Sequence, residues 1–455
     1  MDASGRITSN LDNFHLDILG QQPRINKLYT PMTFCFPLPD DSSYLQLELI
    51  HTLTEGVERL SAHFPWIAGK VVNEESIFKI KPFKRTPRLV VKELRSDCFP
   101  SWDAIRQANF PFSMLDESLI APCKTLMVSD ESVSELPVFL IQANFIAGGL
   151  LLTFNGQHGS MDMTGQGQII YLLTKACRKE PFAPSELSVG NMDRTNIIPL
   201  LDDFKPGPEL DHQILKDTPD RGQPIQSQPS KCTWAYFSFS ATSLVALKSL
   251  AMKTISSASS FISTDDVLST FIWQSITRAR LPRLGTPSTL NSTLSRNVNV
   301  RRYLSIPSTY PGLVSNATFH SSAIDALVKE PLGSIAAQLR SALNPESLRY
   351  RTRALATLIS HRGKAGKASF ATSVPELDVR LSSLAIEHCY NFDFGFGKPE
   401  AVRRPQFTEG AREGLAFFLP KTLDGEIAVG ICLRDEDLER LRGDEEFANF
   451  ATYVG

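Results

Sequence analysis

Apolar and polar residues alternate along the chain in patterns that change with the expected secondary structure. Residues 29–36 form a short β-like run, and the apolar spacing from 45 to 62 predicts an amphipathic helix. Two further apolar runs, 138–145 and 150–155, are separated by Ala147-Gly148-Gly149, a connection typical of a β-hairpin. The first part of the chain is therefore expected to mix strands with helices.

The second strand of this hairpin leads to His158, where the pattern changes again. After Asp162 the apolar residues follow a helical period, and this segment ends on Arg178-Lys179, whose charges suit the negative end of a helix dipole. The sequence therefore predicts that His158 lies on a turn between a strand and a helix.

Composition shifts between residues 199 and 231, where Asp, Pro, Gly and Gln dominate and periodicity is lost. A second α/β portion begins near Thr233 and includes strong helical spacing from 264 to 280. A chain of 455 residues is also too long for one ordinary core. We therefore expect an N-terminal domain at 1–200, a linker at 201–230 and a C-terminal domain at 231–455.

Composition and charge narrow the class of protein. The chain is 42% hydrophobic and 21% charged, as in ordinary globular proteins, and a net charge of −2 offers no basic field for nucleic acid or anionic membranes. Seven scattered cysteines without a CxxC pair suggest neither a metal site nor a disulfide framework. No secretory signal or membrane-spanning run is evident, so we expect a cytoplasmic protein without a membrane partner.

His158 is the first candidate for chemistry. A neutral imidazole at the end of a buried strand can accept a proton from a hydroxyl or an amine, and Gly159 beside it lets backbone and ligand approach closely. The alternative is that His158 only satisfies a buried hydrogen bond. Asp162 could orient His158, cap the following helix, or pair with a cation of the other domain.

Two further segments combine aromatic, acidic or basic residues in short patterns. In residues 391–400, Asp393, Gly395 and Gly397 alternate with phenylalanines, which favours a buried structural turn over proton transfer. Arg301 and Arg302 follow a β-like run and could contact phosphates, form an internal salt bridge, or lie at a solvated strand edge.

Taken together, in this order and at these separations, these segments resemble the BAHD acyltransferase family, and most closely its fungal branch of trichothecene acetyltransferases. The resemblance covers nearly the whole chain. Two positions depart from the family pattern: Phe396 replaces the usual Trp of the DFGWG motif, and Met163 replaces a common Gly. The matching segments are 16–21, 64–70, the HxxxD stretch 158–162, 269–273, the arginine run ending at 316–317, and 393–397.

The resemblance implies an α/β fold of two chloramphenicol-acetyltransferase-like domains with a channel between them. It implies that His158, near the middle of the channel, deprotonates the acceptor for direct attack on an acyl-CoA thioester without a covalent acyl-enzyme. Asp162 is expected to turn away from the channel and pair with a cation, with Arg301 the first candidate. Asp393, Gly395 and Gly397 would give structural support.

The resemblance also indicates the two substrates. CoA is expected near Ser263, Thr264, Arg301 and Arg302, whereas Lys364 and Lys367 fit an ordinary solvated loop better. Acetyl-CoA is the expected donor, used as a co-substrate with no tightly bound cofactor and no metal. The expected acceptor is a hydroxyl or amine of a hydrophobic specialised metabolite, and the expected state is a monomer.

Three other functions compete with this interpretation. A condensation enzyme of the peptide-synthetase type shares the fold but carries HHxxxDG, and here Gln157 and Met163 occupy the two extra positions. An acyltransferase could instead take its acyl group from a carrier protein. A binding module without catalysis could also be built on the same fold.

Overall fold

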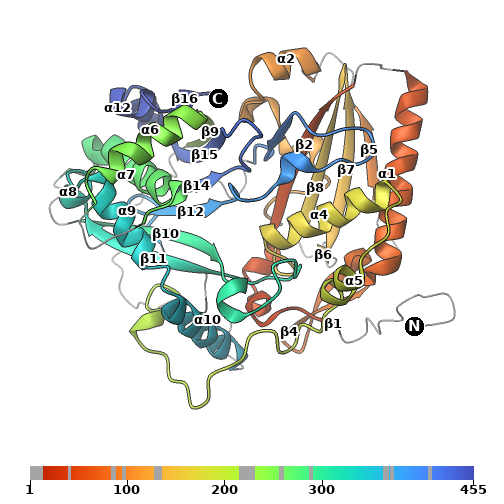
Figure 1. The fold of residues 1–455 in the computed structure, drawn as a ribbon, viewed down its shortest axis with the longest axis horizontal. Helices are drawn as coiled ribbons and strands as arrows, with labels where there is room; N and C mark the ends of the chain where they lie inside the picture. Colours follow the sequence, from red (N-terminus) through yellow and green to blue (C-terminus); the bar gives the residue numbers. More distant parts are fainter. Residues whose placement is uncertain are drawn as a thin grey trace.

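The computed structural model contains three β-sheets and describes residues 14–38, 42–83, 89–94, 99–127, 136–214, 231–255, 261–285, 290–361, 368, 373–407 and 412–455. Two of the sheets are large and belong to the two halves of the chain, with helices packed against them (Figure 1). Lys364 and Lys367 lie outside the described residues.

The first large sheet has the strand order β13-β2-β8-β7-β5. The expected hairpin is confirmed, because β7 and β8 pair antiparallel, and the strand expected at 29–36 is β2. The chain positions of these strands are β2 (Tyr29–Pro37), β5 (Leu89–Glu93), β7 (Phe139–Ile146), β8 (Gly149–Gln157) and β13 (Ala401–Arg403).

Every residue of β7 and β8 is buried, because helices cover both faces of this sheet. Helices α1 (Ser43–His63) and α4 (Met163–Cys177) pack side by side on one face, and α2 (Trp102–Gln107) packs on the other. A strand covered on both faces has a continuous apolar run rather than an alternating one, as its sequence shows. The short α3 (Glu117–Ile120) and α5 (Pro184–Gly190) flank this half.

A small sheet of order β1-β4-β3-β6 lies beside the first half. Its strands are β1 (Phe14–His15), β3 (Gly69–Glu74), β4 (Ile77–Pro82) and β6 (Leu136–Pro137). Leu16, which directly follows β1, packs into the first core. This sheet therefore ties the start of the described chain to the first half.

The second large sheet has the order β11-β10-β12-β14-β15-β9-β16 and mixes parallel with antiparallel pairs. Its strands are β9 (Cys232–Phe239), β10 (Asn291–Asn299), β11 (Ser315–Ala323), β12 (Val379–Ser383), β14 (Leu415–Phe418), β15 (Ile427–Arg434) and β16 (Thr452–Tyr453).

Helix α7 (Thr264–Leu284) lies at the centre of the second core, where the sequence predicted a strong helix. Trp273 is buried on α7, and its indole N–H donates to Ser292 at 2.8 Å. The other helices of this half are α6 (Ala241–Met252), α8 (Ile324–Leu327), α9 (Leu332–Ser341), α10 (Pro345–Ser360), α11 (Asp435–Arg442) and α12 (Glu445–Ala448).

One segment of the second half belongs structurally to the first. After β12 the chain crosses over, Phe394 enters the first core, and β13 pairs antiparallel with β2 through Val402 and Phe34. The chain then returns to the second sheet at β14. The 393–397 motif, which the sequence assigned to the C-terminal domain, thus packs against the N-terminal one.

The expected linker also makes contacts where it is described. Leu210 is fully buried in a third core that joins Leu19 near the start of the chain to Leu355 of α10. Residues 215–230 lie outside the described part of the chain. The two halves are therefore joined by a shared core and a shared sheet, and His158 lies near this junction.

Candidate active site

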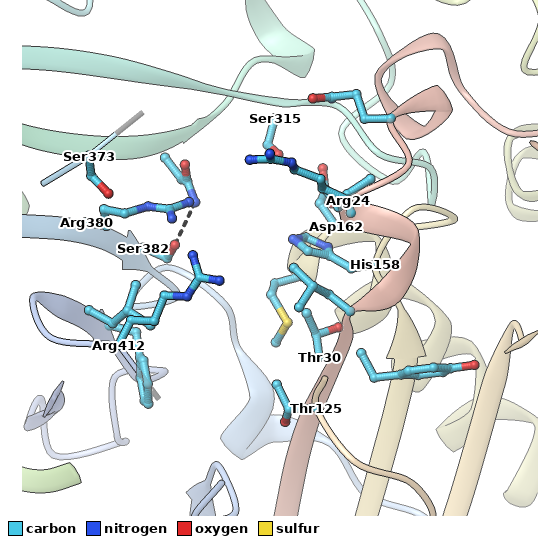
Figure 2. Close-up of a pocket in the computed structure, with 18 of the residues that line it drawn as sticks. Arg24, Thr30, Thr125, His158, Asp162, Ser315, Ser373, Arg380, Ser382 and Arg412 are labelled. Atoms are coloured by element: carbon cyan, nitrogen blue, oxygen red, sulfur yellow. Dashed lines mark hydrogen bonds between the residues drawn. The ribbon is translucent and has the colours of Figure 1, made fainter. Parts of the chain in front are cut away.

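A cavity of about 1190 Å³ lies between the two halves, and residues of both line it. His158, Thr30 and Thr125 come from the first half, whereas Ser315 and Ser382 come from the second (Figure 2). This volume lies above the range of about 300–1,000 Å³ that is usual for small-molecule sites.

His158 lies on the turn between β8 and α4, as the sequence predicted. Its backbone N–H donates to the carbonyl of Leu28 at 2.9 Å, and its ring Nδ1 lies 3.2 Å from the carbonyl oxygen of Met161. A carbonyl only accepts hydrogen bonds, so Nδ1 carries the proton and Nε2 keeps its lone pair for the cavity.

Burial lowers the pKa of His158 below its ordinary value of 6.5, and the positive charge of Arg404 acts in the same direction. The Met161 carbonyl and the carboxylate of Asp162 oppose this effect without cancelling it. The ring is therefore neutral at pH 7, which is the state that a general base requires.

The turn that carries His158 is held by very close backbone packing. A Cβ atom added to Gly159 would lie 2.1 Å from Oδ1 of Asn26, and one added to Gly20 would lie 2.2 Å from the carbonyl oxygen of Gly159. Gln157 is buried beside them and donates to the Asn26 side chain at 3.0 Å. Glycine is needed at 159 because no side chain fits between the turn and the segment that contains Asn26.

Asp162 performs two of the three roles that the sequence allowed. It caps α4 by accepting from the backbone N–H of Gly165 at 2.8 Å, and it forms a bidentate ion pair with Arg301, with both distances 2.8 Å. Val314 N–H donates to the same carboxylate at 2.9 Å. Within the described part of the chain, no hydrogen bond joins the carboxylate to the His158 ring, although Asp162 does contribute to the cavity wall.

Arg301 is the expected cation, and the ion pair with Asp162 is confirmed. The guanidinium of Arg301 also donates hydrogen bonds to the carbonyls of Tyr310 and Gly312 and to the side chain of Asn299. A guanidinium has five N–H donors, and these five bonds use all of them. No N–H donor of Arg301 is therefore left for a phosphate, which argues against the expected contact of Arg301 with CoA.

A second buried cluster, which the sequence did not reveal, supports the same turn. The carboxylate of Asp17 accepts from the hydroxyl of Tyr310 and from the N–H of Leu313, and it lies 3.7 Å from Arg194. Arg194 in turn donates to the carbonyl of Ser160 at 2.6 Å. The ends of the cluster thus reach both the 158–162 turn and the 310–314 loop that holds Arg301.

The 393–397 motif is a structural turn away from the cavity. Asp393 accepts from the N–H groups of Gly395 and Gly397 at 2.8 and 3.1 Å, and both glycines have positive φ values, 98° and 107°. Arg178, which directly follows α4, donates to the carbonyl of Asp393, and Phe394 stacks on Phe154 of β8. The motif therefore braces β8 and α4, the two elements that flank His158.

The other residues expected near CoA do not line the cavity. Ser263 caps α7, and its hydroxyl and backbone N–H both donate to Asp266, at 2.7 and 2.8 Å. Thr264 is the first residue of that helix. Arg302 is exposed, with its guanidinium 4.5 Å from the centre of the Tyr303 ring.

Several cationic residues of the cavity were missed by the sequence reasoning. Arg24 and Lys27 come from the segment before β2, Arg380 from β12, Arg404 from the segment after β13, and Arg412 from the segment before β14. No motif contains them, and only the folding of distant segments brings them together.

The described part of the chain lacks two features. Among the described residues, no group of three or more His, Cys, Asp or Glu side chains could hold a metal ion. In the same part of the chain, no helix combines the length and the apolar character needed to cross a lipid bilayer.

The fold and the site define an acyltransferase built from two sheet-rich halves, with a histidine in the cavity between them. Comparison with protein-family models matches residues 114–448 to the Transferase family and residues 28–177 to the trichothecene 3-O-acetyltransferase-like N-terminal domain. The chain belongs to this family, which confirms the resemblance to BAHD acyltransferases.

Relatives match over their full length. An O-acetyltransferase of Cryptosporiopsis sp. is 51% identical, with 97% of this chain and 98% of the relative covered. The trichothecene 3-O-acetyltransferase of Fusarium sporotrichioides is 46% identical, with 100% of both covered. The crystal structure of the Fusarium graminearum enzyme with coenzyme A and deoxynivalenol has a TM-score of 0.92 at 42% identity, covering 97% and 99% of the two chains.

Proposed function

We propose that this protein transfers an acetyl group from acetyl-CoA to a hydroxyl of a hydrophobic specialised metabolite, with His158 as general base. The observation that carries this proposal is the state of His158: a neutral ring with Nδ1 held by Met161 and Nε2 left for the cavity between the halves. The chemistry of the relatives supports it, because they are named O-acetyltransferases and the Fusarium structures contain coenzyme A.

The reaction needs one proton acceptor and no covalent enzyme intermediate. Nε2 of His158 removes the proton of the acceptor hydroxyl while its oxygen attacks the thioester carbonyl carbon. The tetrahedral intermediate then expels the CoA sulfur, the C–S bond breaks, and the imidazolium returns its proton to the thiolate. A base in this position contributes about 10²- to 10⁴-fold to the rate.

We propose that Asp162 and Arg301 fix the geometry of this base, with Asp393, Gly395 and Gly397 as more remote support. The Asp162 carboxylate is paired with Arg301 and holds the turn, and its charge raises the pKa of His158 less than burial lowers it. The bracing of β8 and α4 by the 393–397 turn keeps the same turn in place from the other side.

We retain the region of Ser263, Thr264 and Arg302 as the proposed CoA contact, without Arg301. The N-terminus of α7 reaches the cavity wall, because Asp265 beside it accepts a hydrogen bond from Ser383, which lines the cavity. Substituting Thr264→Val and Arg302→Met should raise the KM for acetyl-CoA and leave the KM for the acceptor unchanged. A KM for acetyl-CoA equal to that of the wild type in both variants would contradict this placement.

The test of the proposed function is thiol release from acetyl-CoA in the presence of hydroxylated metabolites, including deoxynivalenol as a neutral acceptor. Acyl transfer only from a carrier-bound thioester would favour the carrier-dependent alternative, and amide formation from an aminoacyl thioester would favour a condensation enzyme. Likeness to a peptide synthetase, with a TM-score of 0.56 at 16% identity, concerns the fold alone. A protein that binds metabolites but releases no thiol would be a binding module.

We also propose, from the sequence, that the protein works as a monomer in the cytoplasm and acts on neither nucleic acid nor membranes. Its net charge of −2 supports the last two points. Size-exclusion chromatography with light scattering and fractionation of the source cells would test the others.

A further inference from the structure

The cavity contains more positive charge than its described acidic residues balance. Arg24, Arg380 and Arg412 all line it, and no ion pair or side-chain hydrogen bond joins any of the three to a described residue. The two carboxylates that line the cavity are those of Asp162 and Asp211, and Asp162 is already paired with Arg301. Arg24 and Arg412 are exposed and Arg380 is half-buried, so a ligand in the cavity can reach their guanidinium groups, which bind carboxylates and phosphates strongly.

The three guanidinium groups face one another across the cavity. Figure 2 shows Arg24 on the same wall as His158 and Asp162, with Arg380 and Arg412 on the opposite wall, and all three side chains point into the space between. Burial and the neighbouring charge of Arg412 both lower the pKa of Arg380. An anion bound between them would relieve this repulsion.

We propose that Arg24, Arg380 and Arg412 form an anion-recognition site for the acceptor, so that the natural acceptor is an alcohol that also carries a carboxylate or another anionic group. This inference rests on the proposed acetyl transfer, because it assigns the charge to the molecule that His158 deprotonates. It refines the acceptor from a hydrophobic metabolite to an acidic one.

The location of the site favours the acceptor over CoA. The phosphates of CoA are separated from its thioester by the whole pantetheine arm, so the cations that hold them must lie far from the base. Arg24 instead lies beside His158 (Figure 2). Along β12, Arg380 also precedes Ser383 by about 10 Å of extended chain, and it is Ser383 that reaches the proposed CoA region at α7.

The rest of the lining combines polar side chains with apolar ones. Ser315, Ser382 and Asn297 surround the arginines, and the Asn297 side chain donates to Ser382 at 2.8 Å. Among the described residues, Phe407 and Phe417 are the phenylalanines of the cavity, although the chain contains 28. An apolar body with one anionic substituent would meet both kinds of surface.

Binding of a matched pair of probes tests the proposal. Cholate and its methyl ester have the same ring system and hydroxyls and differ in one negative charge. By calorimetric titration, the wild type should bind cholate about tenfold or more tightly than methyl cholate, the size expected for charge-assisted hydrogen bonds. Equal affinity for the two, or binding of neither, would overturn the proposal.

Variants show which residues produce the preference for cholate, and they distinguish the binding site of the acceptor from that of CoA. Arg380→Met and Arg412→Met should each remove most of the preference for cholate and leave the Kd for CoA unchanged. Arg349→Met, at an exposed position of α10 outside the cavity, is the matched control and should change neither. If Arg380→Met weakens CoA binding as much as cholate binding, the arginines hold CoA phosphates and the proposal is wrong.

The experiment also separates this inference from the proposed function. His158→Ala should keep the preference for cholate, because binding the anion does not require the base. A protein that prefers cholate but acetylates no acceptor would retain the anion site and refute the acetyltransferase. A protein that acetylates deoxynivalenol but shows no preference for cholate would retain the acetyltransferase and refute the anion site.

Discussion

Asp162 and Arg301 form a buried bidentate ion pair that joins the two halves of the chain at the turn carrying His158. Burial alone would lower the pKa of Arg301, but the charge and hydrogen bonds of Asp162 raise it above its ordinary value. The pair is completed by the N–H groups of Gly165 and Val314, so the carboxylate is fully satisfied. This geometry supports the proposal that the pair fixes the turn and does not exchange protons with the base.

Breaking this pair should therefore affect stability as well as rate. Asp162→Asn leaves the guanidinium of Arg301 buried without a counter-charge, and we expect a loss of about 3–5 kcal/mol in the free energy of unfolding. Denaturant titration measures it, with Asp325→Asn on the short helix α8 as a control that should change little. A stability equal to the wild type would contradict a structural role for the pair.

Removing the base should act on the rate alone. His158→Ala is expected to lower kcat by about 10²- to 10⁴-fold, because proton removal is lost while the backbone contacts of the turn remain. Thiol release from acetyl-CoA measures kcat, and thermal unfolding serves as the control for folding. Wild-type turnover in this variant would refute the proposed mechanism.

The activity should depend on pH through the same ring. Because burial lowers the pKa of His158 below 6.5, the neutral base predominates at pH 7, and kcat/KM should rise with pH through an apparent pKa below 6.5 to a neutral plateau. The stability of the fold should change with pH in the same direction. Below pH 6.5 the unfolded chain binds a proton at His158 more readily than the folded chain does, so the free energy of unfolding falls as the pH falls. A rate that increases toward acidic pH would show that the required state is imidazolium.

The sequence predicted the parts of this site that depend on local pattern. The change from strand to helical spacing placed His158 on its turn, and the resemblance of the separate motifs pointed to the pairing of Asp162 with Arg301. The return of 393–403 to the first sheet left no local signal, because β13 pairs with β2 only through the fold. Arg24, Arg380 and Arg412 were missed for the same reason: their shared cavity depends on sheet pairing between distant segments.

The close packing around Gly159 provides a test that is independent of charge. Gly159→Ala places a Cβ 2.1 Å from Oδ1 of Asn26, so the turn or the 20–27 segment must shift and His158 must move with it. We expect a loss of at least about tenfold in kcat/KM together with reduced thermal stability. Gly167→Ala, one turn into α4, is the matched control, since its Cβ would meet nothing nearer than Oε2 of Glu387 at 3.5 Å. That change replaces glycine with a better helix former and should keep full activity. If the two variants behave alike, the packing of the 158–162 turn against Asn26 does not position the base.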